Sequence, residues 1–191
     1  MNLKISIAWS RILLSCGAAL LAFAVTARAA EREHGAHQHG VSHMNIAIED
    51  KSIEIELIAP GADIVGFEHA TGTAINQVAV KNALAALKNG GDFFVFSAAA
   101  GCRLQEAETV SDLTEEHHDE HEKHGQAHEK QNHAEFHARY LFQCDTPARI
   151  SHVDVKLFQR FPTLREVEVQ AVTVSGQSAT ELTPAAPRLM F

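Results

Sequence analysis

The stretch Met44–Leu57, MNIAIEDKSIEIEL, alternates apolar and polar residues on both sides of a short polar turn. Met44, Leu57 and the isoleucines between them occupy every second position of each half, and Glu54 and Glu56 separate the apolar residues of the second half. Because the side chains of a strand point alternately to its two faces, this pattern predicts a β-hairpin with one buried and one solvated face. The dipeptide Pro60-Gly61 predicts its end.

The chain beyond this hairpin predicts more strands than helices. Strands are expected at residues 93–98, 102–110, 136–144, 167–173 and 179–182. A helix that packs on the sheet is expected from apolar residues at helical spacing, namely Ile75, Val78, Ala79, Ala83, Ala86 and Leu87. Thr71 or Thr73 would cap its start. Residues 150–164 fit either a short helix or a strand. We therefore expect an α+β fold, an antiparallel sheet with about two helices on one face.

Residues 1–29 have the pattern of an export signal. Lys4 and Arg11 precede the apolar run 12–25, and residues 27–29 form an A-x-A cleavage signature, so the mature chain would begin at Ala30. The run is shorter than the roughly 20 residues of a membrane span. We expect a periplasmic protein without membrane insertion after signal removal. An uncleaved anchor and a lipoprotein cut before Cys16 are the two alternatives.

The chain without this signal is strongly acidic. The signal takes three of the 16 basic residues and none of the 24 acidic ones, which leaves a net charge of −11 with histidine neutral. This balance opposes binding to nucleic acid or to anionic membranes and favours attraction of cations. We expect a His-rich arm at residues 30–43 and a single metal-binding domain at residues 44–191 that contains a disordered His/Glu-rich loop at residues 111–135.

Two histidine clusters predict metal binding. The segment Glu115–His137 holds seven of the 13 histidines and seven acids, and four of its histidines would form one stripe on a helix. Imidazole and carboxylate suit zinc, copper and nickel. Glu68-His69, in a loop after the hairpin, is a third candidate. The predicted metal ligands are His34, His37, His39, His43, Glu68, His69, His117, His118, His121, His124, His128, His133 and His137. The alternative is a solvated acidic loop and tail whose histidines bind nothing.

Cys102 and Cys144 remain after signal removal, and both lie in expected strands beside the His-rich loop. An even pair in an exported protein predicts one disulfide, with two buried thiols as the alternative. We expect the bond to tie the base of a loop of roughly 40 residues and to contribute about 3–4 kcal/mol through loop entropy.

Five short motifs, in order, resemble those of the ZrgA-type family of exported bacterial zinc-binding proteins. They are His37–Gly40, Gly66–His69, Ala100–Cys102, Phe142–Cys144 and Leu157–Pro162. The resemblance spans most of residues 33–182, with a His-rich insertion in the same place. It implies a periplasmic zinc-binding protein that aids zinc acquisition, with a zinc importer as partner. By position it carries over His37, His39, Glu68, His69 and the two cysteines, and none of the individual histidines of the insertion.

The leading hypothesis is therefore a non-enzymatic protein that captures or buffers Zn²⁺ and helps to deliver it to a zinc importer. A copper or nickel resistance or storage protein is the alternative, because copper(II) exceeds zinc in general affinity. An exported metallohydrolase is disfavoured, because the sequence has no H-E-x-x-H motif.

Overall fold

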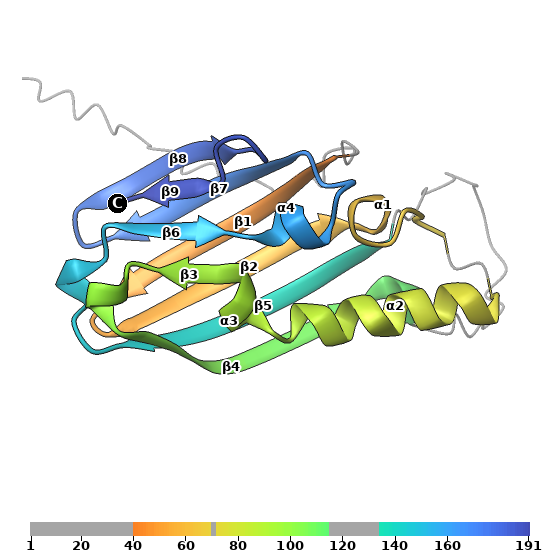
Figure 1. The fold of residues 1–191 in the computed structure, drawn as a ribbon, viewed down its shortest axis with the longest axis horizontal. Helices are drawn as coiled ribbons and strands as arrows, with labels where there is room; N and C mark the ends of the chain where they lie inside the picture. The colour runs from red at the N-terminus through yellow and green to blue at the C-terminus, as the bar shows by residue number, and fades with distance from the viewer. Residues whose placement is uncertain (1–39, 70–71, 115–133) are drawn as a thin grey trace, which may run out of the picture. The chain divides into compact units, whose positions relative to one another are not determined.

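The predicted hairpin lies in the middle of a six-stranded sheet with the order β4-β5-β2-β1-β7-β8 (Figure 1). A computed structural model describes residues 40–69, 72–114 and 134–191. The strands of this sheet are β1 (Val41–Glu49), β2 (Ser52–Pro60), β4 (Cys102–Ser111), β5 (Glu135–Cys144), β7 (Glu166–Thr173) and β8 (Gly176–Leu182). Expected and observed strands agree to within a few residues, except that β1 already begins at Val41 and so includes His43.

A smaller sheet and the helices cover one face of the large sheet. The small sheet has the order β3-β6-β9, and all its pairs are antiparallel. Its strands are β3 (Phe94–Phe96), β6 (His152–Val155) and β9 (Arg188–Met190). The helices are α1 (Gly61–Ile64), α2 (Ala74–Leu87), α3 (Gly90–Phe93) and α4 (Leu157–Arg160), and short 3₁₀ turns lie at Ala98–Ala100, Asp112–Thr114 and Pro147–Arg149. Figure 1 shows α2 beside β4, with β3, β6, α3 and α4 in front of the large sheet.

The α+β class predicted from the sequence is confirmed, with one departure from a purely antiparallel sheet. β1 and β7 pair in parallel, from Val41 opposite Glu166 to Ala47 opposite Val172. The chain reaches β7 after crossing the small sheet, so β7 starts at the same end of the large sheet as β1. There the backbone N–H groups of Arg165 and Glu166 donate to the carbonyl of Gly40, at 2.9 and 2.8 Å.

The core lies between the large sheet and its cover. Ile46, Ile55 and Tyr140 are at most 1 % exposed, as the alternating pattern requires. Aromatic rings join the two layers: Phe94 lies 5.1 Å from Tyr140, and Phe96 lies 5.1 Å from Phe142, centroid to centroid. Edge-to-face contacts of this kind add about 0.5–1.5 kcal/mol each to the burial of the rings.

Two expectations about the helices are resolved by this packing. Residues 150–164 contain both alternatives, because β6 extends the small sheet and α4 follows it directly. In α2, Val80, Ala83 and Leu87 are buried, whereas Ile75 is 81 % and Val78 57 % exposed. The prediction that Ile75 and Val78 pack on the sheet was wrong. Thr73 caps α2 by accepting a hydrogen bond from the Asn76 N–H. No helix in the described ranges is long and apolar enough to span a membrane.

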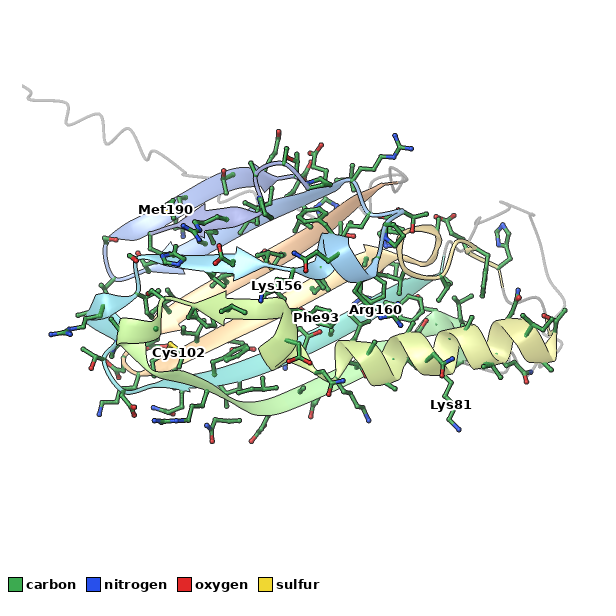
Figure 2. The ribbon with its side chains drawn as sticks, viewed as in Figure 1. Lys81, Phe93, Cys102, Lys156, Arg160 and Met190 are labelled. Carbon is green, nitrogen blue, oxygen red and sulfur yellow. A yellow bond between two sulfur atoms is a disulfide. The ribbon has the colours of Figure 1, made fainter. Side chains whose placement is uncertain are left out.

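Cys102 and Cys144 form the predicted disulfide, but not at the predicted place. They face each other where β4 begins and β5 ends, whereas the insertion leaves the sheet where β4 ends and β5 begins, beyond the pair Ser111–Phe136. Along β4 the two places are nine residues apart, or about 30 Å at 3.3 Å per residue. The bond therefore closes the opposite end of the hairpin, and Figure 2 shows Cys102 at the end of the sheet away from α1.

The other face of the large sheet, here the outer face, is open to solvent and acidic. Every second residue of each of its six strands points to this face, as the period-two pattern predicts. Its acidic residues include Glu54, Glu56, Glu106, Glu108, Glu168 and Glu181. Arg139 lies among them in β5, with its Nε 3.3 Å from Glu54 Oε1. On the opposite side of the molecule, Figure 2 shows Lys156 and Arg160 beside β6 and α4.

Candidate metal centre

Three potential ligands meet where the insertion joins the sheet. β4 and β5 pair up to Ser111 opposite Phe136, so Asp112 follows the last residue of β4 and Glu135 begins β5 beside it. Glu135 and His137 are two residues apart in one strand and therefore point to the same face. Antiparallel pairing thus brings together two segments that are more than 20 residues apart in the sequence.

The donor atoms of these three residues lie within reach of one ion. One ligand atom each of Asp112, Glu135 and His137 lies within 4.8 Å of the other two. His137 Nε2 is 3.0 Å from Glu135 Oε2, and the Glu135 N–H donates to Asp112 Oδ2 at 3.0 Å. Bonds of about 2.0–2.2 Å in a tetrahedron place zinc ligands about 3.3–3.6 Å apart. Small side-chain rotations would therefore bring all three donors to the distances that zinc requires.

The cluster is partly open to solvent. The side chain of His137 is 38 % exposed and that of Glu135 is 13 % exposed, and Asp112 is exposed. Three protein ligands leave a fourth tetrahedral position for water or for a ligand from elsewhere. Among the described residues, this is the one group of three or more His, Cys, Asp or Glu side chains at such distances. The arrangement suits an ion that is bound and released again.

The backbone around the cluster is held by hydrogen bonds to the loop after β2. Gly61 N–H donates to the carbonyl of Ala134 at 2.8 Å, and Ala134 N–H donates to the carbonyl of Glu68 at 3.2 Å. A Cβ at Gly61 would approach the Phe67 carbonyl oxygen to 2.5 Å, so only glycine fits here without a shift of the backbone. These contacts fix the point at which the chain returns from the insertion to β5.

A hollow of about 160 Å³ on the outer face adjoins His137. It is lined by Glu56, Glu108, Thr109, Val110, His137, Ala138 and Arg139. Arg139 pairs in register with Glu56 on one side and Glu108 on the other. The hollow therefore lies between His137 and the glutamates of the acidic outer face, whose negative potential raises the local concentration of cations.

The structure distributes the other predicted ligands over several places. His43 lies in β1 with its Nδ1 3.2 Å from Glu168 Oε2. Glu68 is buried and His69 exposed, and neither belongs to the three-residue cluster. The backbone of Glu68 nevertheless contacts Ala134, so this loop does lie beside the insertion, as a metal corner there would require. Outside the described residues lie His34, His37, His39, His117, His118, His121, His124, His128 and His133.

Asp112 and Glu135 were not among the predicted ligands, although His137 was. The spacing Glu135-x-His137 at the start of a predicted strand was a usable signal, because it places both side chains on one face. Asp112 could be found only by pairing the two strands that flank the insertion.

Comparison with known families supports a role in zinc handling. The model of the ZrgA family of zinc uptake proteins matches residues 36–191. The match includes β1, both strands that form the cluster, and the whole insertion. No curated protein matches the chain.

Proposed function

The chain belongs to the ZrgA family of zinc uptake proteins, and from this premise we propose that it captures Zn²⁺ in the periplasm and passes it to a zinc importer. The observation that carries the proposal is the cluster of Asp112, Glu135 and His137, whose donor atoms lie within 4.8 Å of one another. The cluster lies where the richest histidine segment of the chain joins the folded domain. In this proposal the insertion collects ions and the cluster holds one of them in a defined site.

The exported location and the transfer step are supported by features of the sequence. The signal-like residues 1–29 favour export, and the even cysteine pair suits an oxidising compartment. A partly exposed site with an open ligand position allows a partner to supply a ligand and take the ion. A site that exchanges its ion serves uptake better than a closed structural site, which contributes to folding and keeps its metal.

We assign the cluster a binding role and no catalytic one. The sequence has no H-E-x-x-H motif, in which a glutamate beside the zinc serves as general base. In our proposal both carboxylates of the cluster serve as ligands, and neither is assigned the role of a base. Metal-dependent turnover of an ester or peptide substrate by the purified protein would contradict this assignment.

Calorimetric titration with zinc tests the site directly. The variants Glu135→Gln and His137→Gln keep the size of each side chain but remove a ligand. Each should weaken the affinity of one zinc ion at least about tenfold, or 1.4 kcal/mol, because a three-ligand site loses a third of its protein donors. His152→Gln is the matched control, since His152 also lies near the start of a strand but its Nδ1 faces the hydroxyl of Ser151 at 3.0 Å.

The same titration with copper(II) and nickel addresses the competing metals. Copper(II) binds most nitrogen and oxygen sites more tightly than zinc, so its affinity alone decides little. The decisive result comes from the zinc titration: it shows whether Glu135→Gln and His137→Gln change zinc binding at all. If both variants bind zinc with the affinities and stoichiometry of the unchanged protein, the cluster is not the folded zinc site and the proposal fails.

A further inference from the structure

His137 belongs to a transverse row of residues that crosses the outer face from one edge of the sheet to the other. The row follows from the registers of five neighbouring strand pairs. From β4 to β8 it consists of Val110, His137, Ile58, His43, Glu168 and Glu181. The row thus contains two histidines, each in a different strand, with one apolar residue between them.

His43 and Glu168 have the separation of two ligands of one metal ion. His43 Nδ1 lies 3.2 Å from Glu168 Oε2, and both side chains are about half exposed, at 51 % and 52 %. Tetrahedral zinc ligands are about 3.3–3.6 Å apart. Glu181 is the direct neighbour of Glu168 in β8, so a second carboxylate lies within one strand spacing. The three residues come from three adjacent strands of one sheet.

The backbone beneath His43 is firmly held. Gly40 N–H donates to Asp63 Oδ1 at 2.6 Å, and the carbonyl of Gly40 accepts from the N–H groups of Arg165 and Glu166. Asp63 is 1 % exposed, so this anchor is protected from water. β1 and β7 are therefore joined at their common start, and the relative position of His43 and Glu168 is set by the parallel register.

The two histidines of the row are too far apart to share one ion. β5 and β1 lie on opposite sides of β2, which places His137 and His43 about 10 Å apart at two strand spacings. Each lies three residues after the point where a His-rich segment meets the described domain. His43 follows Gly40, the first residue that the structure describes, and His137 follows Ala134, the first described residue after the insertion.

We propose that His43 and Glu168, with Glu181 as the neighbouring carboxylate, form a second zinc-binding site at the base of the arm. This inference rests on the proposed function and extends it. Each His-rich segment then has its own zinc-binding site at its junction with the sheet, and both sites lie on the acidic outer face. An exposed His–Glu ion pair alone contributes little to stability. The surrounding glutamates add a negative potential that attracts a divalent cation to the pair.

Native mass spectrometry of the full mature chain, titrated with zinc alone, tests the second zinc-binding site. The double variant His43→Gln/Glu168→Gln should bind one zinc ion fewer than the unchanged protein. Glu168→Asp keeps the carboxylate and should retain the ion, and His152→Gln should bind the same number as the unchanged protein. Thermal unfolding without zinc should be nearly the same for all variants, because the altered side chains are exposed.

The outcomes separate this inference from the proposed function. If His43→Gln/Glu168→Gln keeps every ion while His137→Gln/Glu135→Gln loses one, the proposal of a second zinc-binding site fails and the proposed function of the cluster is supported. If neither double variant loses an ion, both proposals fail. If His43→Gln loses an ion but Glu168→Gln does not, the histidine binds with other partners and the pair is overturned. Anomalous scattering at the zinc edge should give two peaks about 10 Å apart, at His137 and at His43.

Discussion

At the scale of single residues, Tyr140 joins three elements of the core. Its ring is fully buried and packs edge-on against Phe94, and its hydroxyl donates to the carbonyl of Leu87 at 2.8 Å. That carbonyl belongs to the last residue of α2, which otherwise lacks a helical partner. A Cβ at Gly90 would collide with the Tyr140 ring, so the first residue of α3 must be glycine. Burial raises the pKa of Tyr140 above its ordinary value of about 10.

Replacing Tyr140 by phenylalanine should therefore have a small cost at neutral pH and a protective effect at high pH. The variant loses one buried hydrogen bond, about 1 kcal/mol of unfolding free energy. Since the folded-state pKa of Tyr140 is raised, its contribution is present below pH 10 and is lost as the pH rises further. The unfolding free energy of the unchanged protein should fall more steeply above pH 10 than that of the variant.

Urea unfolding of the two proteins across this pH range measures the difference. Tyr140 is the chain's one tyrosine, so the ultraviolet absorbance of tyrosinate reports its ionisation directly. Equal slopes above pH 10, or ionisation of the folded protein near pH 10, would contradict the burial argument.

At the scale of elements, the β4–β5 hairpin has its disulfide and its proposed metal site at opposite ends. The disulfide lies at one end and the Asp112–Glu135–His137 cluster at the other. Between them the two strands are paired along their whole length, with one irregularity between Leu104 and Glu106. The two ends should therefore respond independently to mutation.

Removal of the disulfide should lower stability without changing zinc binding. The double variant Cys102→Ala/Cys144→Ala should lose about 3–4 kcal/mol of unfolding free energy, because the unfolded chain is no longer cross-linked over 42 residues. Zinc affinity of the folded variant should match that of the unchanged protein, since the cluster is about 30 Å away. Chemical unfolding and calorimetry measure the two quantities. A parallel loss of zinc affinity would show that the hairpin couples its ends.

At the scale of the whole molecule, both His-rich segments join the domain at the same end of the large sheet. Gly40, before β1, and Ala134, before β5, are held by the same segment after β2, which consists of α1 and the loop that follows it. Asp63 of α1 binds Gly40, and Gly61 of α1 and Glu68 of the loop bind Ala134. Residues 31–43 and 115–137 are far apart in the sequence, yet their junctions with the fold are neighbours. Both junctions therefore lie at one end of the sheet that carries the acidic outer face.

Deletion of residues 115–133 should preserve the fold and the cluster but reduce the number of bound zinc ions. It leaves residues 112–114 and 134 as a connection of four residues between β4 and β5, a common length for a hairpin loop. Circular dichroism and thermal unfolding should show the native fold, and native mass spectrometry should count fewer ions with one still sensitive to His137→Gln. An unchanged ion count would mean that the six histidines of the deleted segment do not bind zinc.

Much of the fold could be predicted from local sequence patterns, and the errors of that prediction have a common cause. Alternation predicted the faces of β1, β2 and β5, and helical spacing predicted α2. The same spacing could not show that Ile75 and Val78 extend beyond the sheet, because periodicity describes a helix and not its neighbours. The parallel pairing of β7 and the small sheet likewise depend on how the chain crosses, which no single segment encodes.

The sequence by itself determined which potential metal ligands this protein carries and which face of each strand is buried. Both are local properties: side-chain type sets which atoms can bind a metal, and a period of two sets burial. Only the tertiary structure decided which ligands meet. Asp112 meets Glu135, and His43 meets Glu168 although 125 residues separate them, because strand pairing brings distant segments to one strand spacing. The same pairing put the disulfide at the far end of the hairpin, since register, and not distance along the chain, sets which residues face each other.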